Sequence, residues 1–251
     1  MDHVFKQLET DFQVFTATPS TLVFSIEAEE LVRGEALDPL LTLLTKQMQL
    51  QTPAAVNASL LSKNYAHFLI AGLSMISNWN LGVSFHPTNL LFGADGEGRF
   101  LMIVKDAIAT PAHSDRTTWR SSGMKELYAH HLTPLFHEMN RRYRVPLPTL
   151  WENAYGYIDA YYRKWIAEAP TSSDKERLAS DFRFLLKEAD PEIFGTTKNP
   201  FTIFEEDNIE RTDEGLPIRK TCCLYYKVAD QCCRNCPRVY GKEDPYPLTS
   251  H

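Results

Sequence analysis

All five cysteines of this 251-residue chain lie in one short segment near its C-terminus. The segment reads TCCLYYKVADQCCRNCP over residues 221–237 and contains Cys222, Cys223, Cys232, Cys233 and Cys236. Inert core thiols would be scattered along the chain, so this grouping indicates a metal or cluster site. Thiolates bind soft centres such as Zn²⁺ and iron-sulfur clusters, usually four to a site.

The spacing of the cysteines favours a cluster with two irons. Cys233 and Cys236 form a C-x-x-C pair, in which a tight turn can direct two sulfurs at one metal. Adjacent Cys222 and Cys223 diverge in extended backbone, so they reach one centre only if the chain turns there or if they bind separate irons. A 2Fe-2S cluster offers two irons, and the pattern therefore favours it over a single zinc ion.

Basic residues surround the cysteines, although the whole chain has a formal net charge of -6. Only Asp230 opposes them between residues 216 and 241. The basic residues are Arg219, Lys220, Lys227, Arg234, Arg238 and Lys242. Nearby positive charge favours a reduced cluster and raises its potential. The same charge can attract an anionic substrate.

The C-C, about ten residues, C-x-x-C arrangement resembles the tail of the FhuF-like family of siderophore-iron reductases. Ten residues separate Cys222 from Cys233, and nine separate Cys223 from Cys233. The family gap follows the second cysteine, so this chain is one residue short unless Cys232 shifts the register. The resemblance implies that the ligands of a 2Fe-2S cluster are Cys222, Cys223, Cys233 and Cys236, and leaves out Cys232.

The resemblance also implies an activity, partners and a compartment. A cytoplasmic enzyme would reduce Fe³⁺ to Fe²⁺ in a ferric siderophore of the hydroxamate or citrate type. Because the sequence has no recognisable NAD or flavin site, the electron would come from an external donor such as a ferredoxin or a flavoprotein reductase. The substrate-binding residues that we expect are cationic: Arg116, Arg120, Arg219, Lys220, Lys227, Arg234 and Arg238.

Two other functions compete with this hypothesis. Four thiolates from a short segment also make a closed zinc site, which would give a zinc-stapled, non-enzymatic binding protein. The second alternative is an ATP-using enzyme, because the chain contains a pattern that resembles the H-x-x-N…D segment of aerobactin-type siderophore synthetases. The residues of this pattern are His86, Asn89 and Asp106, and they can equally be polar groups that stabilise the fold. Disulfides would need an oxidising compartment, which nothing in the sequence indicates.

Composition limits the remaining possibilities. The chain is 43% hydrophobic and 23% charged, which is typical of a globular protein. A sequence pI near 5.8 argues against nucleic acid as a partner. No apolar stretch reaches the roughly 18 residues of a membrane span, and the N-terminal residues lack the pattern of a secretory signal, so we expect a cytoplasmic protein without a transmembrane segment.

The periodicity of apolar residues predicts an α+β, mainly helical body with a small central β-hairpin or sheet. We expect helices over residues 4–14, 38–48, 54–79, 124–143, 151–166 and 173–190. We expect strands over residues 21–26, 90–92, 100–104 and 201–204. The abundance of Ser, Thr, Pro and Ala in residues 107–123 predicts a loop. This loop would either bind siderophore oxygens as a lid or be a solvated loop whose charges have no role in binding.

The same reasoning divides the chain into two parts. Residues 1–211 would form a siderophore-binding body, and residues 212–251 a C-terminal 2Fe-2S module packed on it. The module is too small to hold a core alone, so its order would come from the cluster and from docking onto the body.

Overall fold

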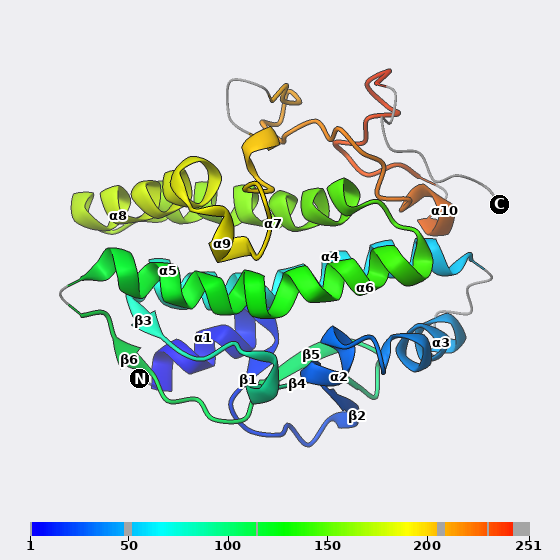
Figure 1. Cartoon of the computed structure of the whole chain (residues 1–251), viewed down its shortest axis with the longest axis horizontal. Helices are drawn as coiled ribbons and strands as arrows, with labels where there is room; N and C mark the ends of the chain where they lie inside the picture. Colours follow the sequence, from blue (N-terminus) through cyan, green and yellow to red (C-terminus); the bar gives the residue numbers. More distant parts are fainter. Residues whose placement is uncertain (1, 48–51, 114, 205–208, 230, 243–251) are drawn as a thin grey trace.

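The computed structural model describes residues 2–47, 52–113, 115–204, 209–229 and 231–242. Long helices lie side by side across the middle of the molecule, with a small sheet and three N-terminal helices on one side and the cysteine segment on the other (Figure 1). The architecture confirms the predicted α+β, mainly helical class. Within the described residues, no helix combines the length and the apolar character needed to cross a membrane.

The sheet is built around the predicted hairpin. Strands β4 (Leu90–Asp95) and β5 (Phe100–Val104) pair antiparallel, with Leu90 opposite Val104. Asp95 stabilises the turn between them by accepting hydrogen bonds from the backbone N–H groups of Glu97 and Arg99 at 3.0 and 2.9 Å. The turn also contains Gly98 at φ 77°, a left-handed conformation that glycine adopts without strain.

Two more strands complete the sheet in the order β1-β5-β4-β2. Strand β2 (Leu22–Glu27) lies antiparallel to β4, and β1 (Val14–Phe15) lies parallel to β5. Strands β3 (Leu81–Gly82) and β6 (Thr110–Pro111) form a separate two-stranded sheet.

Helix α4 (Ala54–Ser77) is the centre of the helical layer. Most of its residues are buried, including small and polar ones, because elements pack on it from several sides. Its long neighbour is α7 (Leu147–Glu168). At Gly72, an added Cβ would lie 2.5 Å from a methyl carbon of Leu127, so glycine at this position allows close packing.

The other helices cover this centre. Helices α1 (Asp2–Phe12), α2 (Ala28–Val32) and α3 (Leu37–Gln47) lie on the side of the sheet. A π-helical turn at Tyr128–Leu132 joins α5 (Arg116–Leu127) to α6 (Thr133–Tyr143). Shorter elements follow α7: α8 (Ser172–Arg183), a π-helical turn (Phe184–Glu188), α9 (Pro191–Phe194), a 3-10 turn (Thr202–Phe204) and α10 (Tyr226–Ala229).

Two local predictions are wrong. Residues 116–123, which the sequence places in a loop, belong to α5, because the Asp115 side chain caps its first turn by accepting a hydrogen bond from the N–H of Thr118 at 3.1 Å. Residues 202–204 form a 3-10 turn instead of a strand. There the Asn199 side chain accepts a hydrogen bond from the N–H of Phe201, and both phenylalanines, Phe201 and Phe204, are buried.

Candidate functional site

A buried carboxylate on α7 anchors the cysteine segment to the body. Glu152, only 3% exposed, accepts hydrogen bonds from the backbone N–H of Lys220 at 2.6 Å and of Thr221 at 2.8 Å. It also accepts one from the Thr221 hydroxyl. These contacts hold the chain directly before Cys222, so the first cysteine pair starts from a fixed position.

The anchor continues through Arg219 to helix α4. Arg219 is 7% exposed, lies 3.5 Å from the Glu152 carboxylate and donates a 2.8 Å hydrogen bond to the Asn153 side chain. The amide of Asn153 in turn donates to the backbone oxygen of Ser59 at 3.1 Å. The Ser59 hydroxyl donates to the backbone oxygen of Cys223 at 3.0 Å. Helix α7 therefore holds the chain directly before Cys222, and helix α4 holds it at Cys223.

The linker before the segment is also held by the body. Arg211 contacts the buried carboxylate of Asp159 on α7, with 2.9 Å between its closest nitrogen and oxygen. Arg211 is the last residue of the predicted body, and the division at this point stays a prediction.

The two adjacent cysteines have different surroundings. Cys222 is packed with Val56 and Leu224 in a small apolar cluster, and its sulfur accepts a 3.4 Å hydrogen bond from the N–H of Leu224. Leu224 has a φ of 65°, so the chain turns sharply directly after the pair. Cys223 instead meets Cys233, and their sulfurs are 3.9 Å apart.

The separation of Cys223 and Cys233 fits two ligands of one metal. Two thiolates at about 2.3 Å from a tetrahedral metal lie about 3.8 Å apart. A backbone hydrogen bond of 3.0 Å from the N–H of Cys236 to the oxygen of Cys233 closes the C-x-x-C turn. The turn leaves Cys236 buried, at 2% exposure.

Neighbouring groups shift the pKa values of three of the thiols. The hydrogen bond from the Cys233 thiol, aided by the charges of Arg219 and Lys63, holds the pKa of Cys223 well below its usual range. The same hydrogen bond raises the pKa of Cys233. Burial and a hydrogen bond with the Cys236 thiol raise the pKa of Cys232. The lowered pKa favours the thiolate form of Cys223, and thiolates are the form that binds metal.

This arrangement consists of pairs. Within the part of the chain that the structure describes, no three His, Cys, Asp or Glu side chains surround one point closely enough to hold a single metal ion. Cys223 pairs with Cys233, and Cys232 with Cys236. Each pair offers two sulfurs to a metal, whether one iron of a binuclear cluster or a zinc ion.

The basic residues predicted around the cysteines differ in their surroundings. Arg219 is buried in the anchor, and the Lys220 ammonium donates to the backbone oxygen of Ile203 at 2.6 Å. Arg234 forms an ion pair with Glu214 at 3.2 Å. These three cations thus already have partners within the protein.

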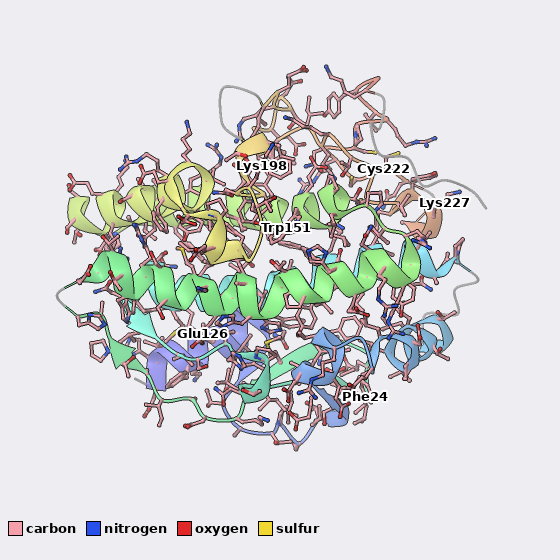
Figure 2. All side chains as sticks on the ribbon, viewed as in Figure 1. Phe24, Glu126, Trp151, Lys198, Cys222 and Lys227 are labelled. Carbon is pink, nitrogen blue, oxygen red and sulfur yellow. The ribbon has the colours of Figure 1, made fainter. Side chains whose placement is uncertain are left out.

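Two other residues of the predicted substrate-binding set make cation–π contacts with one aromatic ring. Lys227 and Arg238 both lie over the ring of Tyr226, with Arg238 at 4.4 Å from the ring centre. Cys222 and Lys227 lie at the same end of the molecule, away from Glu126 (Figure 2). Both cations belong to the tail, and the charge of Arg238 acts on Cys232.

Lys63 on α4 is a site residue that sequence reasoning missed. Its ammonium lies 3.9 Å from the Cys223 sulfur and 5.7 Å from the centre of the Tyr225 ring. The two residues are 160 positions apart in the sequence, and Lys63 belongs to no motif. Only the docking of the tail on α4 brings them together.

The structure places Arg116 and Arg120 away from the cysteines. Both contact the fully buried carboxylate of Asp181 on α8, Arg116 with two nitrogens at 2.7 and 2.6 Å and Arg120 at 2.7 Å. Arg120 also stacks on the ring of Phe184. Helix α5 begins at the end of the molecule opposite to α10 (Figure 1). These contacts account for the two arginines as ion-pair partners that stabilise the fold.

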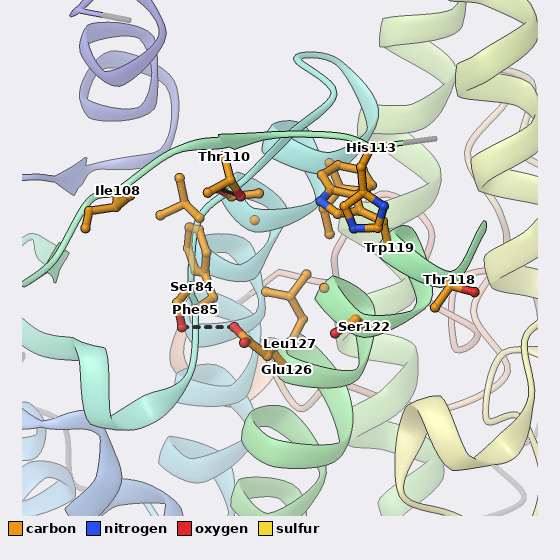
Figure 3. A pocket seen from close by; sticks show the side chains of 15 residues that line it. Ser84, Phe85, Ile108, Thr110, His113, Thr118, Trp119, Ser122, Glu126 and Leu127 are labelled. Atoms are coloured by element: carbon orange, nitrogen blue, oxygen red, sulfur yellow. Dashed lines mark hydrogen bonds between the residues drawn. The ribbon is translucent and has the colours of Figure 1, made fainter. Parts of the chain in front are cut away.

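Other residues of the predicted lid line a separate cavity. His113 and Trp119 lie on one side of a cavity of about 470 Å³, across from Ser84 and Glu126, whose hydroxyl and carboxylate form a 3.0 Å hydrogen bond (Figure 3). This cavity contains none of the cysteines. The predicted lid thus contributes to a pocket, but not beside the candidate metal centre.

The polar residues that resemble a synthetase motif have local roles. The Asn89 side chain donates to the backbone oxygens of Ser84 and Asp106 and accepts from the N–H of Asp106, at 2.9 to 3.0 Å. His86 contacts the hydroxyl of Thr88 at 2.7 Å. These bonds account for Asn89 as a brace between two turns.

No protein-family model matches the chain, and no curated protein matches it.

Proposed function

We propose that this protein is a ferric-siderophore reductase that holds a 2Fe-2S cluster in its C-terminal cysteine segment and acts in the cytoplasm. The observation that carries the proposal is the approach of Cys223 and Cys233 to 3.9 Å, next to the ammonium of Lys63. Both thiols belong to the tail, which the body holds in place, and Lys63 of the body adds a positive charge beside them. A thiolate next to a fixed cation is suited to a centre that gains negative charge when it is reduced.

The chain's own residues would hold and tune the centre. Cys223 and Cys233 would bind one iron, and Cys236 the second iron. Either Cys222, as the resemblance implies, or Cys232, which contacts Cys236, would complete the second pair. Arg219 and Lys63 would compensate the negative charge of the thiolates, and the Glu152 anchor would fix the segment against α7.

A bound 2Fe-2S cluster supplies one electron at a time, which an external donor such as a ferredoxin or flavoprotein reductase replaces. One electron converts siderophore-bound Fe³⁺ to Fe²⁺. Fe²⁺ has a lower charge and is held more weakly by hard oxygen donors, so it leaves the chelate. The hydroxamate or citrate class of siderophore and the identity of the donor belong to this proposal.

The test is a visible and EPR spectrum of anaerobically purified protein before and after chemical reduction, together with its iron, sulfide and zinc content. We expect a brown protein with two irons and two sulfides per chain that bleaches on reduction and gives a one-electron EPR signal. The Cys236→Ser variant should keep its circular dichroism but lose the reduction of a ferric siderophore.

Zinc is the outcome that would overturn the proposal. The 3.9 Å separation of Cys223 and Cys233 also suits two ligands of a tetrahedral zinc ion. A colourless protein that contains zinc, and that iron and sulfide do not convert, would support a zinc-stapled binding protein instead.

A further inference from the structure

A second cavity lies directly beside the cysteine segment. Its volume is about 250 Å³, and residues from α3, α4, α7, β5 and the tail line it. The apolar part of the wall includes Leu44, Leu60, Leu61 and Phe100. Lys63, which lies 3.9 Å from the Cys223 sulfur, lines the same cavity. A molecule in this cavity therefore lies close to the candidate metal centre.

The charge of the cavity selects its ligand. Among the described residues that line it, Lys63 is the one charged side chain, and no described carboxylate forms an ion pair with Lys63. The ammonium also lies beside the Cys223 sulfur, and its position at the edge of an apolar wall favours an anionic group in the cavity, because low local polarity strengthens the attraction.

Tyr157 adds a hydrogen-bond donor. Its ring packs against His67, with 5.2 Å between ring centres, and no described residue accepts a hydrogen bond from its hydroxyl. The pKa of Tyr157 is raised, mainly by burial and to a smaller extent by the charge of nearby Cys223, so the hydroxyl keeps its proton at neutral pH. The lining of the cavity thus includes one side chain with an ammonium and one with a hydroxyl, both of which can donate to an anionic ligand.

We infer that this cavity receives one oxygen-donor arm of an anionic ferric chelate, with Lys63 and Tyr157 binding its oxygens beside Cys223. The inference rests on the proposed function for the identity of the ligand. The volume of about 250 Å³ lies below the range of roughly 300 to 1,000 Å³ that holds a whole drug-sized ligand. The cavity suits one carboxylate-bearing arm, and the rest of the chelate stays in solvent.

Gallium(III) citrate tests the inference without any electron transfer, because Ga³⁺ resembles Fe³⁺ in charge but is not reduced under these conditions. Calorimetric titration of the full chain should show binding that Lys63→Met weakens about tenfold or more, as expected for a lost charge-assisted contact. Tyr157→Phe should weaken it about three- to tenfold, as expected for one neutral hydrogen bond. Lys175→Met, at an exposed position on α8, is the matched control and should bind like the wild type.

An uncharged chelate separates charge from shape. Gallium(III) tris(acetohydroxamate) should lose no more than about twofold on Lys63→Met, because it has no net charge for the ammonium to attract. An equal loss for both chelates would overturn the role of charge. Because Lys63→Met could disturb the metal centre, the metal content of each variant is measured, and Tyr157→Phe serves as the second probe.

The outcomes distinguish this inference from the proposed function. A protein that contains the cluster but binds gallium citrate equally well in the wild type, Lys63→Met and Tyr157→Phe forms would overturn the inference alone. A protein without a cluster that still binds gallium citrate through Lys63 would support the inference and overturn the reductase.

Discussion

Removing the charge of Glu152 tests how the cysteine segment is held. In the Glu152→Gln variant, the side chain keeps its size but loses the carboxylate that accepts from Lys220 N–H, Thr221 N–H and the Thr221 hydroxyl. It also loses the ion pair with Arg219 at 3.5 Å, and one amide group now offers a donor where the carboxylate accepted. We expect the variant to lose the contacts between the tail and α7 before any other part of the fold is affected.

The size of the effect follows from burial. Glu152 is 3% exposed and Arg219 is 7% exposed, so solvent does little to replace the lost partner. Breaking a buried ion pair by removing one partner typically costs about 3–5 kcal/mol, because the remaining charge is left uncompensated. We expect a loss of this order in the free energy of docking of residues 219–236, with a much smaller change in the stability of the helical body.

Limited proteolysis and metal analysis provide the assay. The variant should be cleaved near the cysteines at least tenfold faster than the wild type and should retain less metal, while its body resists cleavage as before. Glu176→Gln, at an exposed position on α8, is the matched control and should behave like the wild type. If the variant stays protected and keeps its full metal content, the metal alone orders the segment and the anchor is unimportant.

Two further predictions concern the body. Asp181→Asn removes the carboxylate that contacts Arg116 and Arg120. The free energy of unfolding, measured in urea, should fall by about 3–5 kcal/mol without a change in metal content. A decrease below about 1 kcal/mol would contradict the role of these arginines in stability. Burial lowers the pKa of His131 from 6.5 to about 4, so the unfolded chain binds a proton that the folded chain does not, and stability should fall as the pH drops from about 6.5 toward 4. The loss at pH 5 is about 2 kcal/mol relative to neutral pH, measured by urea unfolding. In His131→Gln this part of the pH dependence should disappear, and an unchanged pH profile would refute the assignment to His131.

Local sequence patterns predicted much of the secondary structure. The hairpin of β4 and β5 follows from two short apolar runs on either side of a polar turn with Gly98, and α4 and α7 follow from apolar repeats of helical period. These patterns involve residues that are close in sequence, so they can be recognised without knowledge of the fold. The start of α5 was missed because its first turns are polar and depend on the Asp115 cap.

The candidate site divides in the same way. The sequence by itself determined that all five cysteines share one segment and that basic residues flank them, since both are local facts. Only the tertiary structure decided which cations lie beside the thiols: α4 places Lys63 next to Cys223, while Asp181 holds Arg116 and Arg120 elsewhere. Such contacts join residues 61 to 160 positions apart, and they arise from the packing of helices, for which a linear pattern contains no signal.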